Sequence, residues 1–297
     1  MKKFTGIIIP VTTPFEKDGS INFDNLRYNI RKWNKTDVIG YMCLGSNGEF
    51  KALSDEESYE VVKTVIEEKG DKCLIVGAGR ESVPQTLEFI NKLLPLKDAI
   101  DYVSIITPNY FPKLIDDKVI ENFYTSIADK SPMPVLLYTA PSYNNNVGIS
   151  PAIAKKLADH PNIYGMKDTS SNMMAEYVEA VGGRDDFMLI AGSINNLILC
   201  LKGGGTAGVV SAANYFPNES AEIVTLFMDG KEQEAEEKQI ALRALLKETG
   251  AKYGVQGVKA CMNLLGWKAG SPRTPYLPLE GEELEGVRQA FIDNKIL

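Results

Sequence analysis

The chain has 297 residues, 44% of them hydrophobic, which is enough to bury the core of one large domain or two small ones. Its formal net charge of −7 disfavours nucleic acid and anionic membrane surfaces as main partners. The sequence shows no signal peptide and no transmembrane run, so we expect a cytoplasmic protein without a membrane partner.

Short apolar runs of strand length alternate with amphipathic stretches of helical length over most of the chain. This alternation predicts an α/β protein with a parallel sheet, and eight units are the number that closes a (β/α)8 TIM barrel. An open, doubly wound sheet is the alternative, weakened because no G-x-G-x-x-G turn follows the first strand. The eight predicted strands are Gly6–Ile9, Val38–Cys43, Cys73–Val76, Tyr102–Ile106, Val135–Tyr138, Ile163–Met166, Phe187–Ile190 and Ala207–Val210.

Capping signals mark the starts of several predicted helices. Ser54 stands three residues before Glu57, which is the spacing of a capping box. Ser150 precedes Pro151, and proline is favoured at the first position of a helix. The predicted helices include residues 55–68, 83–94, 116–128 and 150–158.

The chain changes character after about residue 225. A charged helical stretch over residues 229–249 is followed by an amphipathic segment over 257–265 and a helix over 282–293, with no strand candidate. We therefore expect a barrel domain over residues 1–225 and a C-terminal helical bundle over residues 226–297 that packs on it.

The cysteine and histidine content argues against a metal centre. The four cysteines are far apart and form no C-x-x-C pair, so buried free thiols are expected in place of zinc ligands or disulfides. The single histidine, His160, precedes Pro161 in a predicted turn and is expected to be structural. We expect no metal and no cofactor, with acid–base chemistry carried by Lys, Tyr, Ser, Thr, carboxylates or the substrate.

Lys167 is the most informative residue of the chain because it closes the buried run Ile163–Met166. Burial disfavours the ammonium form of a lysine and leaves an amine that can attack a carbonyl group and form a Schiff base. The alternative is a lysine that reaches solvent where the strand ends, since lysine is seldom fully buried.

Other candidate residues come at the carboxyl ends of the predicted strands, where barrel enzymes place their active sites. They offer two phenols for proton relay and hydroxyl, amide and backbone groups that could bind a carboxylate. With Lys167 they favour imine chemistry that needs no metal. These candidates are Ser46, Asn47, Tyr110, Tyr138, Tyr143, Thr169, Gly192, Ser193 and Val209.

Three motifs together resemble the signatures of the dihydrodipicolinate synthase / N-acetylneuraminate lyase family. They are Gly45 to Glu49, Leu136 to Tyr138 with Pro141, and Gly165 to Asp168, and their order and spacing are more specific than any one alone. The resemblance covers nearly the whole chain. It implies a class I, pyruvate-dependent aldolase or lyase on a barrel with a helical C-terminal extension, commonly a homotetramer built from dimers.

The resemblance also implies roles for particular residues. Lys167 would form the imine with pyruvate or another 2-oxo acid, and Tyr138 would shuttle protons beside it. Ser46 and Asn47 would hold the pyruvate carboxylate, although an Asn-Gly pair is also a strong turn signal. Tyr110 would complete the relay and is often lent by a neighbouring subunit, although it could equally pack against its neighbour in sequence. The remaining substrate-site candidates are Thr169, Gly192, Ser193, Val209 and Tyr143.

One departure from the family pattern bears on the second substrate. The synthase branch typically carries an arginine soon after the Tyr-x-x-Pro motif, to hold a carboxylate of that substrate. The counted positions here are Tyr143 and Asn146, and neither side chain replaces a bidentate guanidinium. The runs Ser46 to Phe50 and His160 to Asp168 also look closer to the 4-hydroxy-2-oxoglutarate aldolases of the family, which tend to lack this arginine. The resemblance therefore favours cleavage of 4-hydroxy-2-oxoglutarate, or of a related sugar acid, over dihydrodipicolinate synthesis. Tyr143 and residues 144–146 would select the aldehyde, or would form a solvated loop.

Two readings of another kind stay open. The chain could be a non-catalytic protein that binds 2-oxo acids, or a metal-dependent class II aldolase. The intact set of lysine, tyrosine and serine argues against the first, and the lack of a ligand cluster argues against the second. The aldehyde, the direction of the reaction, the oligomer and any effector site are left undetermined.

Overall fold

The computed structural model describes residues 2–297, and its eight strands form a closed barrel in sequence order. All the strand pairs described are parallel. The predicted (β/α)8 barrel is therefore confirmed, and the open sheet is excluded. The strands are β1 (Gly6–Pro10), β2 (Gly40–Cys43), β3 (Cys73–Gly77), β4 (Tyr102–Ile106), β5 (Val135–Thr139), β6 (Ile163–Asp168), β7 (Met188–Ala191) and β8 (Ala207–Val209).

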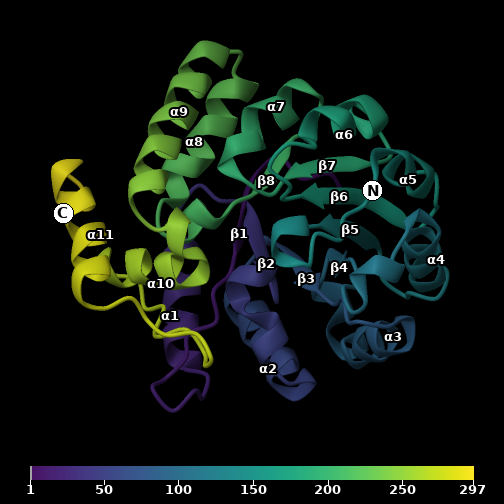
Figure 1. Cartoon of the computed structure of the whole chain (residues 1–297), viewed down its shortest axis with the longest axis horizontal. Helices are drawn as coiled ribbons and strands as arrows, with labels where there is room; N and C mark the ends of the chain where they lie inside the picture. The colour runs from purple at the N-terminus through teal and green to yellow at the C-terminus, as the bar shows by residue number, and fades with distance from the viewer. Residues whose placement is uncertain (1) are drawn as a thin grey trace. The chain divides into compact units, whose positions relative to one another are not determined.

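The chain divides into two compact units. The first contains residues 2–6 and 73–209, and its helices cover the outer face of β3 to β8 (Figure 1). These helices are α3 (Val83–Lys92), α4 (Asp117–Ala128), α5 (Pro151–Leu157), α6 (Met174–Val181) and α7 (Leu197–Lys202).

The second unit contains residues 7–72 and 210–297. Within it α8 packs along α9, and α10 contacts α11 (Figure 1). The predicted helical C-terminal extension is present, while the division at residue 225 stays a prediction. The helices of this unit are α1 (Phe23–Trp33), α2 (Asp55–Glu68), α8 (Pro217–Met228), α9 (Glu232–Glu248), α10 (Gly254–Leu264) and α11 (Gly281–Asp293).

The predicted helix caps are formed. The Ser54 hydroxyl accepts a hydrogen bond from the backbone N–H of Glu57, whose carboxylate accepts one from the backbone N–H of Ser54. At α5 the Ser150 hydroxyl accepts from the backbone N–H of Ile153, with Pro151 at the first helical position. Each cap satisfies N–H groups that have no partner inside the helix, so the local sequence alone determines where these helices begin.

Strand register in the first unit sets which residues share a level of the barrel. Tyr138 of β5 pairs with Lys167 of β6, and Lys167 pairs with Ile190 of β7. The approach between β6 and β7 is close at Gly165, where an added Cβ would lie 2.5 Å from the carbonyl oxygen of Met188. Only glycine fits there, because a backbone carbonyl in a sheet cannot move aside.

We predict that Gly165→Ala destabilises the protein by roughly 1–3 kcal/mol, since the methyl group overpacks the β6–β7 pair. Gly286→Ala in α11 is the matched control, because among the described residues no atom lies within 4 Å of its added Cβ. The control should gain up to about 1 kcal/mol from helix propensity. Denaturant unfolding of both variants measures the difference, and equal stabilities would contradict the packing argument.

Candidate active site

Lys167 and Tyr138 are brought together at the carboxyl ends of β6 and β5. Both side chains are buried, with 6% and 3% of their surface exposed. The Lys167 Nζ atom lies 4.4 Å from the centre of the Tyr138 ring. The alternative of a lysine that escapes into solvent is thus excluded, and a buried amine stands against an aromatic face.

Tyr124 holds the end of β5 in place. The Tyr124 hydroxyl donates to the backbone carbonyl of Ile105 at 2.9 Å and is 3.4 Å from that of Tyr138. Its burial raises the pKa of Tyr124 far above the ordinary value for a phenol, so this hydroxyl stays protonated. We assign Tyr124 a structural role, which sequence reasoning missed because its partners lie on neighbouring strands.

Asp168 follows the lysine and is fully buried. Its Oδ1 atom accepts a hydrogen bond from the backbone N–H of Ser170 at 2.8 Å, while Oδ2 has no hydrogen-bond partner among residues 2–297. Desolvation raises the pKa of Asp168 to about 6, against the opposing effect of the Ser170 hydrogen bonds. A carboxyl group of this kind is neutral in mild acid and charged at neutral pH.

Thr169 and Gly192 are in close contact after β6 and β7. The Gly192 N–H donates to the carbonyl of Asp168 at 2.6 Å, and an added Cβ would lie 2.5 Å from that oxygen. The buried Thr169 hydroxyl has no hydrogen-bond partner within the described chain. Glycine is therefore required at position 192 by backbone contact, and a polar hydroxyl is left beside it.

The two remaining candidates of this rim have local structural surroundings. The Ser193 hydroxyl accepts from the backbone N–H of Asn195 at 3.2 Å and so caps a short helical turn. Val209 is buried, with 1% of its surface exposed. Roles of both residues toward a substrate stay predictions.

The asparagine run after β5 is buried at Asn144 only, while Asn145 and Asn146 are exposed. Asn144 is fully buried, and its Nδ2 atom donates to the carbonyl and the hydroxyl of Thr107, both at 2.7 Å. Asn109 donates to the Asn144 side-chain oxygen, and Asn145 donates to the Asn109 carbonyl. These amides hold the β5–α5 loop against the β4–α4 loop. The prediction of a loop that selects the aldehyde did not include this structural role.

Tyr110 and Tyr143 are exposed on these two loops, with 68% and 62% of their surface accessible. The Tyr110 ring lies 4.3 Å from that of Phe111, so the predicted relay tyrosine packs against its neighbour in sequence. Desolvation of the hydroxyl and the nearby Tyr138 both raise the pKa of Tyr143. Both side chains are therefore largely open to solvent, and roles of both residues toward a substrate stay predictions.

Ser46 and Asn47 belong to the second unit, where they form the short helical turn Ser46–Gly48. Both are half-buried. The Asn47 Nδ2 atom donates to the Ser211 hydroxyl at 2.8 Å, and the Gly48 carbonyl accepts from the Thr13 hydroxyl at 2.7 Å. The turn is thus tightly held, and its sharing of one site with Lys167 stays a prediction.

The histidine and the cysteines have the expected structural settings. His160 Nε2 lies 3.1 Å from an Asp129 carboxylate oxygen, and Nδ1 accepts from the backbone N–H of Asn162. All four cysteines are buried and free. Across residues 2–297 no group of three or more His, Cys, Asp or Glu side chains is arranged to hold a metal ion. No helix in that range is both long enough and apolar enough to cross a membrane.

A buried strand-end lysine beside a tyrosine, on a parallel barrel, is the arrangement of enzymes that hold a carbonyl substrate as a lysine imine. The sequence model of the Dihydrodipicolinate synthetase family matches residues 3–293, and the chain belongs to this family. The predicted family resemblance is confirmed, and with it the prediction of a lyase of the class I aldolase type.

Individual relatives match over nearly the whole chain. The 4-hydroxy-tetrahydrodipicolinate synthase of Haloarcula marismortui is 30% identical over 290 residues, covering 97% of this chain and 93% of the relative. The enzyme of the same name from Methanothrix thermoacetophila is 29% identical over 291 residues, covering 97% and 96%. The dihydrodipicolinate synthase of Thermotoga maritima superposes with a TM-score of 0.90 over 100% of both chains at 24% identity, which bears on the fold alone.

These relatives correct the main functional prediction. Cleavage of 4-hydroxy-2-oxoglutarate was favoured by the sequence, and this is wrong, because the relatives are named 4-hydroxy-tetrahydrodipicolinate synthases. The predicted closeness of the motifs to 4-hydroxy-2-oxoglutarate aldolases is not confirmed either. That prediction depended on two motif runs and on the absent arginine in a rim loop, and the arginine bears on the second substrate and not on Lys167.

We predict that Asp168→Asn abolishes a pH dependence of stability that the native chain shows in mild acid. The pKa of Asp168 is raised to about 6 in the folded protein, above that of an unfolded aspartate, so its contribution to folding is present below about pH 4. It is lost as the pH rises through 6, a change on the order of 3 kcal/mol.

Urea unfolding between pH 4 and 7 measures this slope in the native chain and in the variant. Asp185→Asn is the control, because that carboxylate is fully exposed and should leave the slope unchanged. An Asp168→Asn variant with the native slope would show that another group titrates.

Proposed function

We propose that this chain is a 4-hydroxy-tetrahydrodipicolinate synthase, which condenses pyruvate with aspartate semialdehyde through an imine on Lys167. The observation that carries the proposal is the buried Lys167 amine, 4.4 Å from the centre of the Tyr138 ring, in a chain of the Dihydrodipicolinate synthetase family. The names of the full-length relatives supply the particular reaction.

The proposed reaction has four steps at Lys167. The Lys167 amine adds to the keto carbon of pyruvate and water leaves, which gives the imine. The imine draws electrons from the adjacent methyl group, which gives up a proton and becomes the carbon nucleophile. That carbon attacks the aldehyde carbon of the second substrate, whose oxygen takes up a proton. The amine of the second substrate then displaces Lys167, so the ring closes and the enzyme is regenerated.

Tyr138 is the group that would carry protons, because its ring lies beside the Lys167 amine. Ser46 and Asn47 would bind the pyruvate carboxylate with hydroxyl, amide and backbone donors, since loops after parallel barrel strands build one active-site rim. Thr169 and Gly192 would line the same rim, together with Ser193 and Val209.

Tyr110 would complete the proton relay from a neighbouring copy of the chain. Its side chain is 68% exposed beside the exposed Phe111, which favours a contact between subunits over a role inside its own subunit. We propose the homotetramer on this ground and on the family resemblance. The absence of a metal or other cofactor and the cytoplasmic location remain part of the proposal, and insensitivity to EDTA tests the first of them.

The chain lacks the arginine that is expected to bind the carboxylate of the second substrate. Tyr143 and Asn146 stand at the counted positions, and the amides of Asn144 and Asn145 bond to the neighbouring loop. Weak binding of aspartate semialdehyde is therefore expected relative to an enzyme with a guanidinium there.

We predict that borohydride reduction in the presence of pyruvate leaves one stable adduct, located on Lys167 by peptide mass spectrometry. Lys167→Arg should give no adduct and no turnover, because a guanidinium forms no imine under these conditions. Lys156→Arg is the control, since Lys156 is an exposed lysine paired with Glu121 and should keep the adduct. A folded native chain that acquires no adduct would overturn the imine mechanism and favour a binding protein.

We predict that Tyr143→Arg lowers the KM for aspartate semialdehyde roughly tenfold, the effect of one added charge-assisted hydrogen bond to its carboxylate. The KM for pyruvate should stay unchanged. Asn146→Arg is the control and should not lower this KM. Its φ of 59° is a backbone conformation that a side chain as large as arginine tolerates poorly.

Steady-state rates with both substrates provide these constants. The outcome that refutes the synthase assignment is a native chain that condenses pyruvate with other aldehydes but gives no product with aspartate semialdehyde. The lysine mechanism would survive that result, because the adduct experiment tests it separately.

A further inference from the structure

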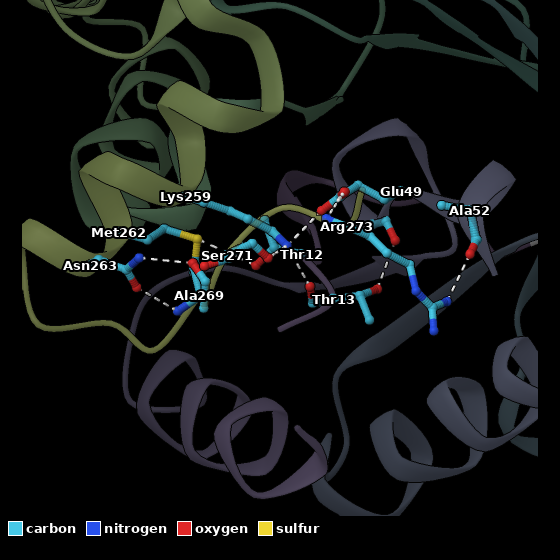
Figure 2. A network of polar contacts seen from close by, with 12 residues as sticks. Thr12, Thr13, Glu49, Ala52, Lys259, Met262, Asn263, Ala269, Ser271 and Arg273 are labelled. Carbon is cyan, nitrogen blue, oxygen red and sulfur yellow. Dashed lines mark hydrogen bonds and ion pairs between the residues drawn. The ribbon is translucent and has the colours of Figure 1, made fainter. Parts of the chain in front are cut away.

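The second unit contains a buried lysine that the proposed reaction does not use. Lys259 of α10 is 1% exposed, and its Nζ atom contacts three oxygens (Figure 2). These are the Glu49 carboxylate at 2.6 Å, the Thr13 carbonyl at 2.8 Å and the Ser271 carbonyl at 2.8 Å. The contact with Glu49 is an ion pair, and the two carbonyl contacts are hydrogen bonds. Desolvation lowers the pKa of Lys259 to about 8, against the opposing effect of Glu49.

Glu49 comes directly after the turn Ser46–Gly48 and is itself buried. One carboxylate oxygen pairs with Lys259, and the other accepts from the backbone N–H of Arg273 at 2.8 Å. Both oxygens are therefore bound by the C-terminal part of the chain. The backbone N–H of Glu49 in turn donates to the carbonyl of Ser46 at 3.1 Å, so the residue closes the turn that it follows.

The residues on either side of the turn have backbone conformations that need contacts with other parts of the chain to stabilise them. Leu44 before it and Glu49 after it have φ values of 56° and 53°, in the left-handed region that side chains other than glycine and asparagine avoid. Such conformations persist where the surroundings over-determine them. The ion pair with Lys259 supplies that support at one end.

Arg273 extends the same support to α2. Its guanidinium donates to both carboxylate oxygens of Glu57 at 2.5 and 2.8 Å. It also donates to the carbonyl of Ala52 at 2.7 Å (Figure 2). Glu57 also accepts from the backbone N–H of Ser54 in the capping box. The segment between the Ser46 turn and α2 is thus held at both ends from the C-terminal region.

We propose that Lys259 and Glu49 are positioning residues for the substrate carboxylate, through which α10 of the C-terminal extension holds the turn that carries Ser46 and Asn47. The inference rests on the proposed function, in which that turn binds the carboxylate of pyruvate. The extension is then part of the substrate site as well as a packing element. A loosened turn lowers affinity for the carboxylate while leaving the chemistry at Lys167 intact.

The test compares two ketones in the borohydride reaction. Pyruvate has the carboxylate and acetone lacks it, yet both form an imine with a lysine. We expect Glu49→Gln to raise the pyruvate concentration for half-maximal trapping roughly tenfold, with acetone trapping unchanged. The amide oxygen of glutamine can still accept from the Arg273 N–H, so this variant keeps part of the network.

The double variant Glu49→Gln/Lys259→Met protects the test against misfolding. It removes both buried charges together, whereas a single change leaves the partner charge buried and unpaired. We expect the same loss of pyruvate trapping, with acetone again unaffected, in protein shown to be folded by its near-ultraviolet circular dichroism.

Asn263→Ala is the matched control from the same helix. Asn263 donates to the carbonyl of Gly270 and accepts from the N–H of Ala269 (Figure 2), so these two hydrogen bonds stay within the C-terminal segment. It should lower stability and leave both trapping curves in place.

Two results overturn the inference while the proposed function stands. One is native pyruvate trapping in the folded double variant, and the other is an equal loss for pyruvate and acetone, which indicates general damage. A native chain that pyruvate does not trap overturns the proposed function, and the positioning role with it.

Discussion

The parallel pairing of β5 with β6 is the constraint on which the proposed chemistry depends. It places Tyr138 opposite Lys167, and the next pair along the chain is Thr139 with Asp168. Successive strand residues point to opposite faces, so a slip by one residue would exchange the lysine for a buried carboxyl group. Gly165 permits the close approach of β7 that holds this register from the other side. The reactive amine is thus positioned by backbone hydrogen bonds and packing, before any contact with a substrate.

Two buried lysines show how surroundings decide what a lysine does. Lys259 is held between a carboxylate and two carbonyl oxygens, an environment that suits an ammonium ion and fixes its position. Lys167 lies against the face of the Tyr138 ring and pairs with Ile190 on the neighbouring strand. The first lysine is fixed by an ion pair and two hydrogen bonds, and the second lies against an aromatic face. Both lysines stand among apolar residues in the sequence, so the difference emerges only from the folded chain.

Much of the fold could be predicted because its signals are local. Short apolar runs bounded by turns marked all eight strands, and the capping box of Ser54 with Glu57 marked the first residue of α2. Strand ends were less certain: the second strand begins at Gly40 and not at Val38, since apolar character alone does not reveal where pairing starts. The bracing of two loops by Asn144 and the pairing of Glu49 with Lys259 could not be predicted, because each partner comes from a distant part of the chain.

The missing arginine is a difference at one position, whereas the similarity to the relatives extends over nearly the whole chain. The first bears on the second substrate, and the second bears on the class of reaction. In the proposed reaction Lys167 and Tyr138 hold the 2-oxo acid as an imine, and relatives that match nearly the full chain carry a synthase name. The β5–α5 loop would meet the second substrate, so a missing guanidinium there would change affinity for that substrate and leave the class of reaction intact. The loop is anchored at one point, since Asn144 donates to the carbonyl and the hydroxyl of Thr107. In the proposed reaction the second carboxylate would meet the surface around Tyr143, so the choice of aldehyde would follow from this loop and not from Lys167.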